Sequence, residues 1–357
     1  MRIRLIGQRN SLGIGTHYAN FADALKRRAG VGHLVDEVDF LDREAFDRAV
    51  VSSQSDDINI CFVAANIHDF FQGTNIQWIV FESTIIAENI LSVLQEADQV
   101  WVPSVWGRKT LIDNGISVER IYIVPEGVNP DQYYAVGINK PDSRPTRFLF
   151  VGKYEDRKSC RELLEAWHQA WDNDPSVELI IKTNYFVDYP EKQEQLNQHI
   201  VDLGITNVQV IWGELSSDDM ITLYRSCDIF VFPTKGEGWG LPLIEAAAMG
   251  LPLITTFYSA PRDFLQPISS SCLFVDYDIK PIDCPEFKKF YTSTNGSWGD
   301  WAHPRVDSLA RRMRQAVDEL AKLAQEAQKN SEIIRKDWTW TKSVDLALAA
   351  IRSTAQT

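Results

Sequence analysis

Residues 228–245 read DIFVFPTKGEGWGLPLIE, and they predict a strand, a glycine-rich loop and the start of a helix. The apolar run 229–232 suits a buried strand, and Pro242 suits the first turn of a helix. Such a loop lets backbone N–H groups converge at a helix N-terminus, where the partial positive charge favours an anion such as phosphate. This stretch therefore predicts an α/β fold with a site for a phosphorylated ligand.

Two carboxylates flank the predicted anion site. Glu237 lies in the loop, and Glu245 lies about one turn into the helix. A carboxylate is poorly placed to hold phosphate, but it accepts hydrogen bonds from hydroxyl groups. We therefore expect a ligand that carries both phosphate and sugar diols. The alternative is a tight turn with Glu245 on a solvated helix face, and a second, basic loop upstream argues against it.

The upstream loop lies in residues 150–161, FVGKYEDRKSCR, which again read as strand, loop and helix start. It brings Lys153, Arg157 and Lys158 close together. Lysines act as compact point charges, and two of them between a sheet edge and a helix N-terminus suit a diphosphate. The alternative is a set of ordinary surface lysines paired with the neighbouring acidic residues.

Composition limits the class of protein. A chain of 357 residues suits two domains of ordinary size. The net charge of −13 argues against a surface that binds nucleic acid. Five scattered cysteines without a CxxC pair fit reduced thiols in a cytoplasmic protein. No apolar run approaches the about 20 residues that cross a bilayer, and the first residues read as a strand rather than a signal peptide.

Apolar, β-rich runs alternate with helical patterns along the chain, which predicts parallel sheets covered by helices on both faces. A polar stretch at 135–146 reads as a linker, so we expect two doubly wound domains that face a cleft. The region 276–304 breaks the alternation and is interpreted as an irregular excursion. The predicted strands are 3–7, 33–40, 58–65, 78–81, 99–103, 121–125, 147–151, 177–182, 208–212, 229–232 and 251–255.

Three weaker signals concern cofactors and metals. The loop GQRNSLGIGT at 7–16 resembles a dinucleotide fingerprint, but Tyr18 occupies the position of the third glycine. Asp276-Tyr277-Asp278 has a DxD spacing, which can hold a metal and a nucleotide diphosphate, and a solvated loop is the favoured interpretation. The six histidines show no zinc-binding spacing. We therefore expect no metal and no cofactor.

With these residues in place, the chain resembles the retaining GT-B glycosyltransferases of the large group 1 family, which includes sucrose synthase and bacterial mannosyltransferases. Glu237 and Glu245 resemble its Glu-x7-Glu motif, and Gly152-Lys153 followed by Arg157-Lys158 resembles its basic pair. Lys153 replaces the usual arginine. Further similarity lies in IVPEGVN at 123–129, where Glu126 replaces the usual asparagine, and in the tail 338–340, which looks like the point where a final helix returns to the N-terminal domain.

The resemblance implies a GT-B fold with an acceptor-side domain formed by residues 1–138 and about 339–357, and a nucleotide-sugar donor domain formed by 145–335. It implies a metal-independent, retaining hexosyltransferase that moves a sugar from a UDP- or GDP-sugar to a hydroxyl group. The catalytic residues would be Glu237, Lys153 and Lys158. The donor-binding residues would be Gly15, Gly152, Arg157, Gly238, Trp239, Gly240, Leu241 and Glu245.

Within these roles, Glu237 would grip sugar hydroxyls, Glu245 would hold the ribose diol and the lysines would neutralise the leaving diphosphate. FES at 81–83 and VPS at 102–104 resemble acceptor-side segments of one subset of the family. The expected acceptor is a glycan, a glycolipid or a small molecule in polysaccharide or glycoconjugate synthesis, handled in the cytoplasm, with attachment to the membrane surface left open. The candidate acceptor-side residues are His17, His68, Glu82 and Ser104.

Two other classes of protein remain open at this stage. A non-catalytic GT-B-like subunit would bind a nucleotide or glycan without transferring a sugar, and the intact Glu237, Glu245 and Lys158 argue against it. An NAD-dependent oxidoreductase is suggested only by the glycines Gly13 and Gly15.

Overall fold

A computed structural model describes residues 2–10, 13–28, 30–135, 144–185, 190–293 and 295–354 of the chain. The chain forms two compact units. Unit 1 comprises Met1–Gly127, Pro281–Asp300 and Trp338–Thr357, and unit 2 comprises Val128–Lys280 and Trp301–Asp337. The sequence predicts a boundary at 138 and places 281–300 in the donor domain, whereas the structure assigns that segment to unit 1.

Unit 1 is built on a parallel, six-stranded sheet with strand order β2-β1-β3-β4-β5-β6. The chain starts at β1, moves outward to β2 and then returns to β3 on the other side, so the direction of winding reverses between β1 and β3. The strands are β1 (Ile3–Gly7), β2 (Val35–Asp39), β3 (Ile58–Cys61), β4 (Thr74–Trp78), β5 (Gln99–Val102) and β6 (Ile121–Ile123).

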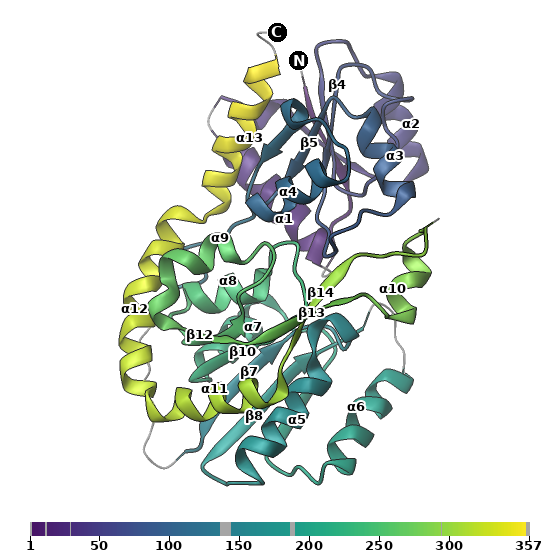
Figure 1. Ribbon diagram of the computed structural model, residues 1–357. Helices are drawn as coiled ribbons and strands as arrows, with labels where there is room; N and C mark the ends of the chain where they lie inside the picture. Colours follow the sequence, from purple (N-terminus) through teal and green to yellow (C-terminus); the bar gives the residue numbers. More distant parts are fainter. Residues whose placement is uncertain are drawn as a thin grey trace. The chain divides into compact units, whose positions relative to one another are not determined.

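The last helix of the chain completes unit 1 (Figure 1). The Nε2 atom of Gln99 on β5 donates a hydrogen bond of 3.1 Å to the carbonyl of Ala350 on α13. Gly127 permits the close approach of the helix start, because a Cβ there would lie 2.3 Å from the backbone of Thr339. The helices of unit 1 are α1 (Gly13–Arg27), α2 (Arg43–Val51), α3 (Glu88–Glu96), α4 (Val105–Asp113), α10 (Pro285–Phe290) and α13 (Trp340–Thr354).

Unit 2 carries a second parallel, six-stranded sheet, with order β12-β11-β10-β7-β8-β9. Its winding reverses between β7 and β10. The strands are β7 (Thr146–Val151), β8 (Val177–Thr183), β9 (Val208–Trp212), β10 (Ile229–Phe232), β11 (Leu253–Thr256) and β12 (Cys272–Val275). The helices are α5 (Cys160–Trp171), α6 (Pro190–Asp202), α7 (Ser217–Arg225), α8 (Leu241–Ala248), α9 (Arg262–Leu265), α11 (Val306–Asp318) and α12 (Leu320–Asp337).

Helices cover both faces of the unit 2 sheet. Phe148 on β7 lies beside Ile229 on β10 and packs edge-on against Trp167 of α5. Phe230, the next residue along β10, points to the opposite face and contacts the ring of Tyr224 on α7. A strand buried on both faces must be apolar throughout, which explains the continuous run IFVF on β10.

The predicted fold class is confirmed, because both sheets are parallel and doubly wound. Two local predictions are wrong. The strand expected at 78–81 lies instead at Thr74–Trp78. The polar residue Gln77 made this segment look unlike a buried strand. Its burial is possible because its side chain donates a hydrogen bond of 2.7 Å to the carbonyl of Ala65. The excursion at 276–304 is regular in part, since β13 (Tyr277–Pro281) pairs with β14 (Asp300–Pro304).

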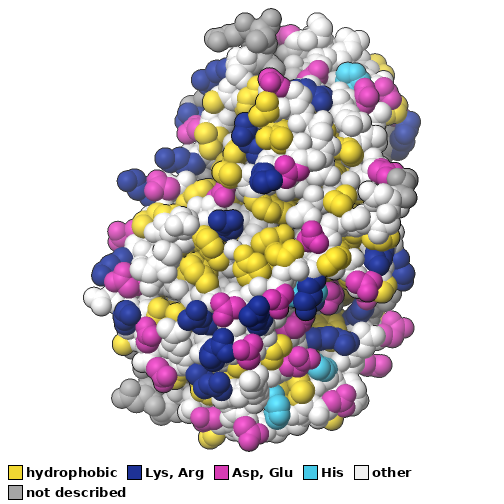
Figure 2. Space-filling model, viewed as in Figure 1, with side chains coloured by type: hydrophobic (Ala, Val, Ile, Leu, Met, Phe, Trp, Pro, Cys, Tyr) yellow, Lys and Arg dark blue, Asp and Glu magenta, His cyan; other side chains and the backbone are white. Residues whose placement is uncertain are grey.

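The charged side chains are mixed on the surface. Figure 2 shows Lys and Arg interspersed with Asp and Glu over the viewed face. The net charge of −13 and the mixed signs on the viewed face argue against a broad basic field for a polyanion there. Phosphate binding would therefore depend on a local site.

Candidate functional site

The candidate site lies in unit 2, where the winding of the sheet reverses. Ligands of open α/β sheets bind beyond the carboxyl ends of the strands at such a point. The two loops there follow β7 and β10, and they are the same two loops that the sequence singles out. The backbone N–H of Lys235 in the β10 loop donates to the carbonyl of Arg157 in the β7 loop, at 2.8 Å. The loops are thus joined through their backbones.

The loop after β7 delivers Lys158 to this point. A single 3-10 turn, Asp156–Lys158, precedes Ser159, whose left-handed backbone (φ 56°) leads into α5. The Lys158 side chain is buried, and its Nζ lies 5.1 Å from the centre of the Phe232 ring at the end of β10. The lysine therefore reaches from the first loop to the second.

Glu237 meets this lysine. Its carboxylate accepts hydrogen bonds from Lys158 Nζ at 2.8 and 3.0 Å and from Arg157 Nη1 at 3.0 Å. Glu237 is only 5% exposed. Burial acts to raise the pKa of Glu237, but the charges of Lys158 and Arg157 outweigh it and hold the pKa below its ordinary value. The carboxylate is therefore an anion that two cations share.

Neighbouring groups fix the orientation of this cluster. The backbone N–H of Glu237 donates to Ser259 Oγ at 2.8 Å, and Ser259 itself has a left-handed backbone (φ 56°). Arg157 also donates to the carbonyl of Gly236 at 2.7 Å and to Glu155 at 2.8 Å. Ser259 is not predictable from the sequence, because nothing in its local pattern shows that it contacts a loop 22 residues away.

The predicted helix N-terminus is that of α8, which begins four residues after Glu237. Gly240 adopts φ +97°, which an L side chain rarely adopts, and α8 begins at the next residue. Trp239 is 1% exposed, and its ring packs against Phe264. The amides from Gly238 to Leu241 thus stand at the start of a helix, beside the Glu237 cluster.

Glu245 lies one turn into α8 in an unusual environment. Tyr224 donates a hydrogen bond of 2.9 Å to its Oε2 atom. Burial raises the pKa of Glu245 to about 7, although hydrogen bonds from Tyr224 and Tyr133 act in the opposite direction. The carboxyl group therefore changes charge near neutral pH. Neither tyrosine was identified from the sequence, which gives no local signal for a pairing across 21 residues.

The other predicted donor-site residues of unit 2 lie in the same two loops. Gly152 directly follows β7, and a Cβ there would come within 3.1 Å of Phe150 Cζ and 3.6 Å of Lys158 Cδ. Lys153 lies next to it and is half-buried. The structure therefore brings Gly152, Lys153, Arg157 and Lys158 into one loop.

The predicted residues of unit 1 have mostly structural surroundings. Gly15 packs so closely on Asn10 that a Cβ would lie 2.1 Å from its side-chain oxygen. His17 is 1% exposed, and the rings of Phe62, Trp78 and Trp340 lie 5.2, 4.3 and 5.7 Å from its own. Burial lowers the pKa of His17 to about 3, so it is neutral. It is a core residue of unit 1.

The remaining candidates of the acceptor side differ in exposure. Ser104 is fully buried and caps α4, because its Oγ accepts a hydrogen bond from the Gly107 N–H at 2.9 Å. Glu82 is half-buried and His68 is exposed. These two side chains reach the surface of unit 1, and the structure describes no cluster that joins them.

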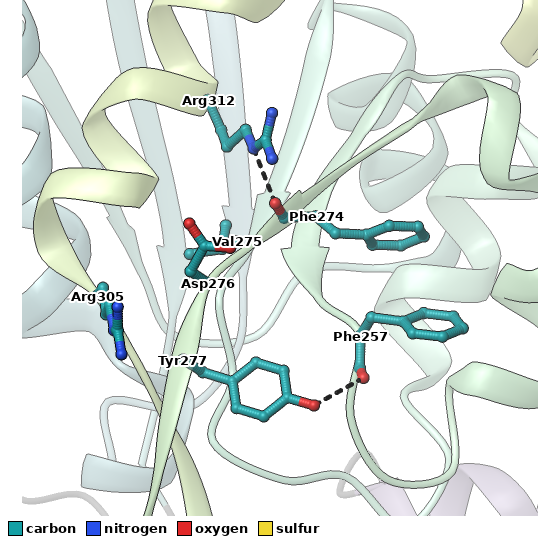
Figure 3. A pocket seen from close by; sticks show the side chains of 7 residues that line it. All are labelled: Phe257, Phe274, Val275, Asp276, Tyr277, Arg305 and Arg312. Atoms are coloured by element: carbon teal, nitrogen blue, oxygen red, sulfur yellow. Dashed lines mark hydrogen bonds between the residues drawn. The ribbon is translucent and has the colours of Figure 1, made fainter.

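The DxD segment borders a separate hollow of unit 2, of about 490 Å³ (Figure 3). Its walls are Phe257, Phe274, Val275, Asp276, Tyr277, Arg305 and Arg312. Asp278 pairs with Arg305 at 3.1 Å, and this arginine lowers the pKa of the carboxyl group. Asp276 accepts a hydrogen bond of 2.9 Å from Ser308. A metal would have to displace these partners.

Two findings concern metals and membranes. Within the described residues, no group of three or more His, Cys, Asp and Glu side chains is arranged to hold a metal ion. No helix in that part of the chain combines the length and the apolar character needed to cross a membrane.

Comparisons with known proteins agree with this geometry. Residues 136–282 match the family model described as "Glycosyl transferases group 1". Mannosylfructose-phosphate synthase of Agrobacterium fabrum is 23% identical over 158 residues, which cover 41% of this chain and 34% of that protein. The chain thus spans about a third of the length of this relative.

Solved structures resemble the whole chain. A sucrose-phosphate synthase from Thermosynechococcus elongatus has a TM-score of 0.74 and 16% identity, with 100% of each chain covered. HepE of Anabaena, solved in complex with UDP and glucose, has a TM-score of 0.73 and 13% identity, with 99% of this chain and 100% of that chain covered. At these identities the likeness establishes the GT-B fold.

Proposed function

We propose that this chain, whose residues 136–282 match the family model of the group 1 glycosyl transferases, transfers a hexose from a nucleoside diphosphate sugar to an acceptor hydroxyl group with retention of configuration. The donor is a UDP- or GDP-sugar. The acceptor is a glycan, a glycolipid or a small molecule in polysaccharide or glycoconjugate synthesis. No metal takes part in the reaction.

The observation that carries this proposal is the cluster of Lys158, Arg157 and Glu237 at the point where the sheet reverses. The reaction breaks the bond between the anomeric carbon and the diphosphate, so negative charge grows on the leaving group. Preorganised cations at that position stabilise the transition state by several kcal/mol. Lys158 and the first amides of α8 supply this charge, and they do the work that a divalent ion does elsewhere.

The carboxylates would divide the remaining tasks. Glu237 accepts hydrogen bonds from the sugar close to the reacting carbon and keeps Lys158 oriented between turnovers. Glu245 receives the ribose diol. The acceptor oxygen bonds to the anomeric carbon on the face that the diphosphate leaves, and the acceptor proton passes to the leaving phosphate oxygen. No covalent intermediate with the protein is required.

The test begins with a panel of UDP-, GDP- and ADP-sugars in excess EDTA. We expect one of them to release its free nucleoside diphosphate slowly in water and faster with an acceptor. NMR of the product should show the anomeric configuration of the donor. Lys280→Gln, which changes an exposed lysine of the same unit, is the matched control and should keep full activity.

Three results would contradict the proposal. Tight binding of a nucleotide sugar without hydrolysis or transfer would identify a non-catalytic binding subunit. Activity that is lost on chelation and restored by manganese would show that a metal ion neutralises the leaving diphosphate. Inversion of the anomeric centre would exclude the same-face reaction.

A further inference from the structure

A third buried lysine lies beside the candidate site. In the described part of the chain, the buried lysines are Lys158, Lys182 and Lys235. Lys158 pairs with Glu237, and Lys235 pairs with Asp156 at 2.7 Å. Lys182 is only 8% exposed, and no described residue forms a hydrogen bond or an ion pair with its ammonium group. A buried charge without a partner is costly unless a ligand compensates it.

The position of Lys182 connects it to the donor site. It is the last but one residue of β8, and in the sheet register it lies between Val151 of β7 and Ile211 of β9. Its carbonyl accepts the N–H of Gly152 at 3.1 Å, where the β7 loop begins. Lys182 therefore stands at the carboxyl end of the sheet, next to the loop that carries Lys158.

Among the residues that the structure describes, no carboxylate lies close enough to Lys182 to form an ion pair with it. Its neighbour Val151 is apolar, and burial lowers the pKa of Lys182. Glu214 acts on it only through a longer-range charge and is itself exposed. A neutral acceptor such as a base carbonyl would not balance the ammonium charge, whereas a phosphate oxygen would.

The charges of Arg157, Lys158, Glu155 and Glu237 cancel, so a further cation would strengthen binding of an anionic ligand. Arg157 and Lys158 carry two positive charges, and their partners Glu155 and Glu237 carry two negative charges. The cluster therefore has no net charge, although a nucleoside diphosphate is a strong anion. A cation outside the cluster would add to the attraction that Lys158 exerts on the diphosphate.

We infer that Lys182 binds a phosphate oxygen of the nucleoside diphosphate, as a cation of the donor site additional to Lys153 and Lys158. This role rests on the proposed function. It accounts for a buried lysine that no described residue pairs with: the ligand supplies the partner.

The test is Lys182→Met, which keeps the length of the side chain and removes the charge. We expect the affinity for UDP, GDP and inorganic pyrophosphate to fall about tenfold or more. The thermal midpoint of the ligand-free protein should stay the same or rise, because a desolvated charge is gone. Lys182→Arg should bind within a few-fold of wild type. Lys280→Met, at an exposed strand position of unit 2, should change neither quantity.

The outcomes separate this inference from the proposed function. Unchanged affinity of Lys182→Met for a diphosphate that wild type binds would overturn the role of Lys182 and leave the proposed function intact. An equal loss for uridine or guanosine, which have no phosphate, would place Lys182 at the base and also overturn it. If Lys182→Met does not fold, Lys182→Gln replaces it in the test. Unchanged affinity of Lys182→Gln for pyrophosphate would overturn the role of Lys182. Failure of the wild-type protein to bind any of these probes would overturn both proposals.

Discussion

Replacing Glu237 by glutamine should have two opposite effects on unit 2. The substitution keeps the shape of the side chain and one acceptor oxygen, but it removes the charge that Lys158 and Arg157 share. Arg157 retains Glu155 at 2.8 Å, so Lys158 is the cation that loses its carboxylate. We therefore expect a less stable protein that binds diphosphate more tightly.

The expected magnitudes follow from the geometry. Removing one partner of a buried ion pair costs about 3–5 kcal/mol, and the retained amide oxygen favours the lower end. A loss of about 3 kcal/mol corresponds to a fall of about 6–12 °C in the thermal midpoint of a domain of this size. At 2.8 Å, the attraction between Lys158 and Glu237 is about 6 kcal/mol for an effective dielectric constant of 20. If a quarter of this attraction becomes available to a ligand, diphosphate affinity rises about tenfold.

Thermal unfolding and calorimetric titration with UDP, GDP and pyrophosphate measure both effects on one preparation. The diphosphate should also recover part of the lost stability through mass action. The double variant Lys158→Gln with Glu237→Gln is the control, because it replaces the ion pair by two neutral amides. It should be close to wild type in stability and weak in diphosphate binding. The coupling between the two sites then gives the interaction energy.

One result would refute this reasoning. If Glu237→Gln is as stable as wild type and binds diphosphate no more tightly, the carboxylate does not restrain Lys158 in solution. Transfer should still be slow in that case if Glu237 contacts the sugar, so the kinetic role of Glu237 is tested separately from its electrostatic role.

Three further predictions concern other parts of the site. Lys158→Gln should lower kcat/KM by about 10²-fold, and near-wild-type initial rates would remove this lysine from the reaction. Because burial raises the pKa of Glu245 to about 7, its stabilising contribution is complete below its ordinary pKa of 4.5 and is lost as the pH rises through 7. Glu245→Gln should therefore gain thermal midpoint over wild type between pH 5 and pH 8. An ionised Glu245 accepts both hydrogen bonds of the ribose diol, so wild-type affinity for uridine or guanosine should rise with pH and that of Glu245→Gln should not; parallel pH profiles of the two proteins would contradict this. Asp276→Asn combined with Asp278→Asn should leave turnover in EDTA nearly unchanged. A large loss of activity in that assay would show that the DxD segment takes part in the reaction.

Local sequence determined the strand–loop–helix units of the site. The apolar run of β10 and the glycines that precede α8 fix a backbone path through nearest-neighbour chemistry, so both were predictable. The basic loop after β7 was predictable for the same reason. Polar residues within a strand defeat this approach, as Gln77 on β4 shows, because their burial depends on a partner elsewhere in the chain.

Side-chain pairing across long separations required the tertiary structure. Lys158 and Glu237 are 79 residues apart, and they meet only because β7 and β10 are neighbours in the sheet. The sequence assigned the first to phosphate and the second to sugar, without showing that each neutralises the other. His17 follows the first loop as a binding residue would, yet α1 turns it into the aromatic core of unit 1.

The sequence by itself therefore determined the class of fold and the two loops that form the candidate site, because periodicity, glycine and proline act over a few residues. The tertiary structure alone decided which charges of the described residues pair with one another at this site. Lys182 illustrates the difference. Its neighbours in sequence, LIIKTN, describe only a strand, and its missing partner becomes visible once β7 and β9 are placed on either side. Strand order sets the electrostatics of this site, and strand order is a property of the whole chain.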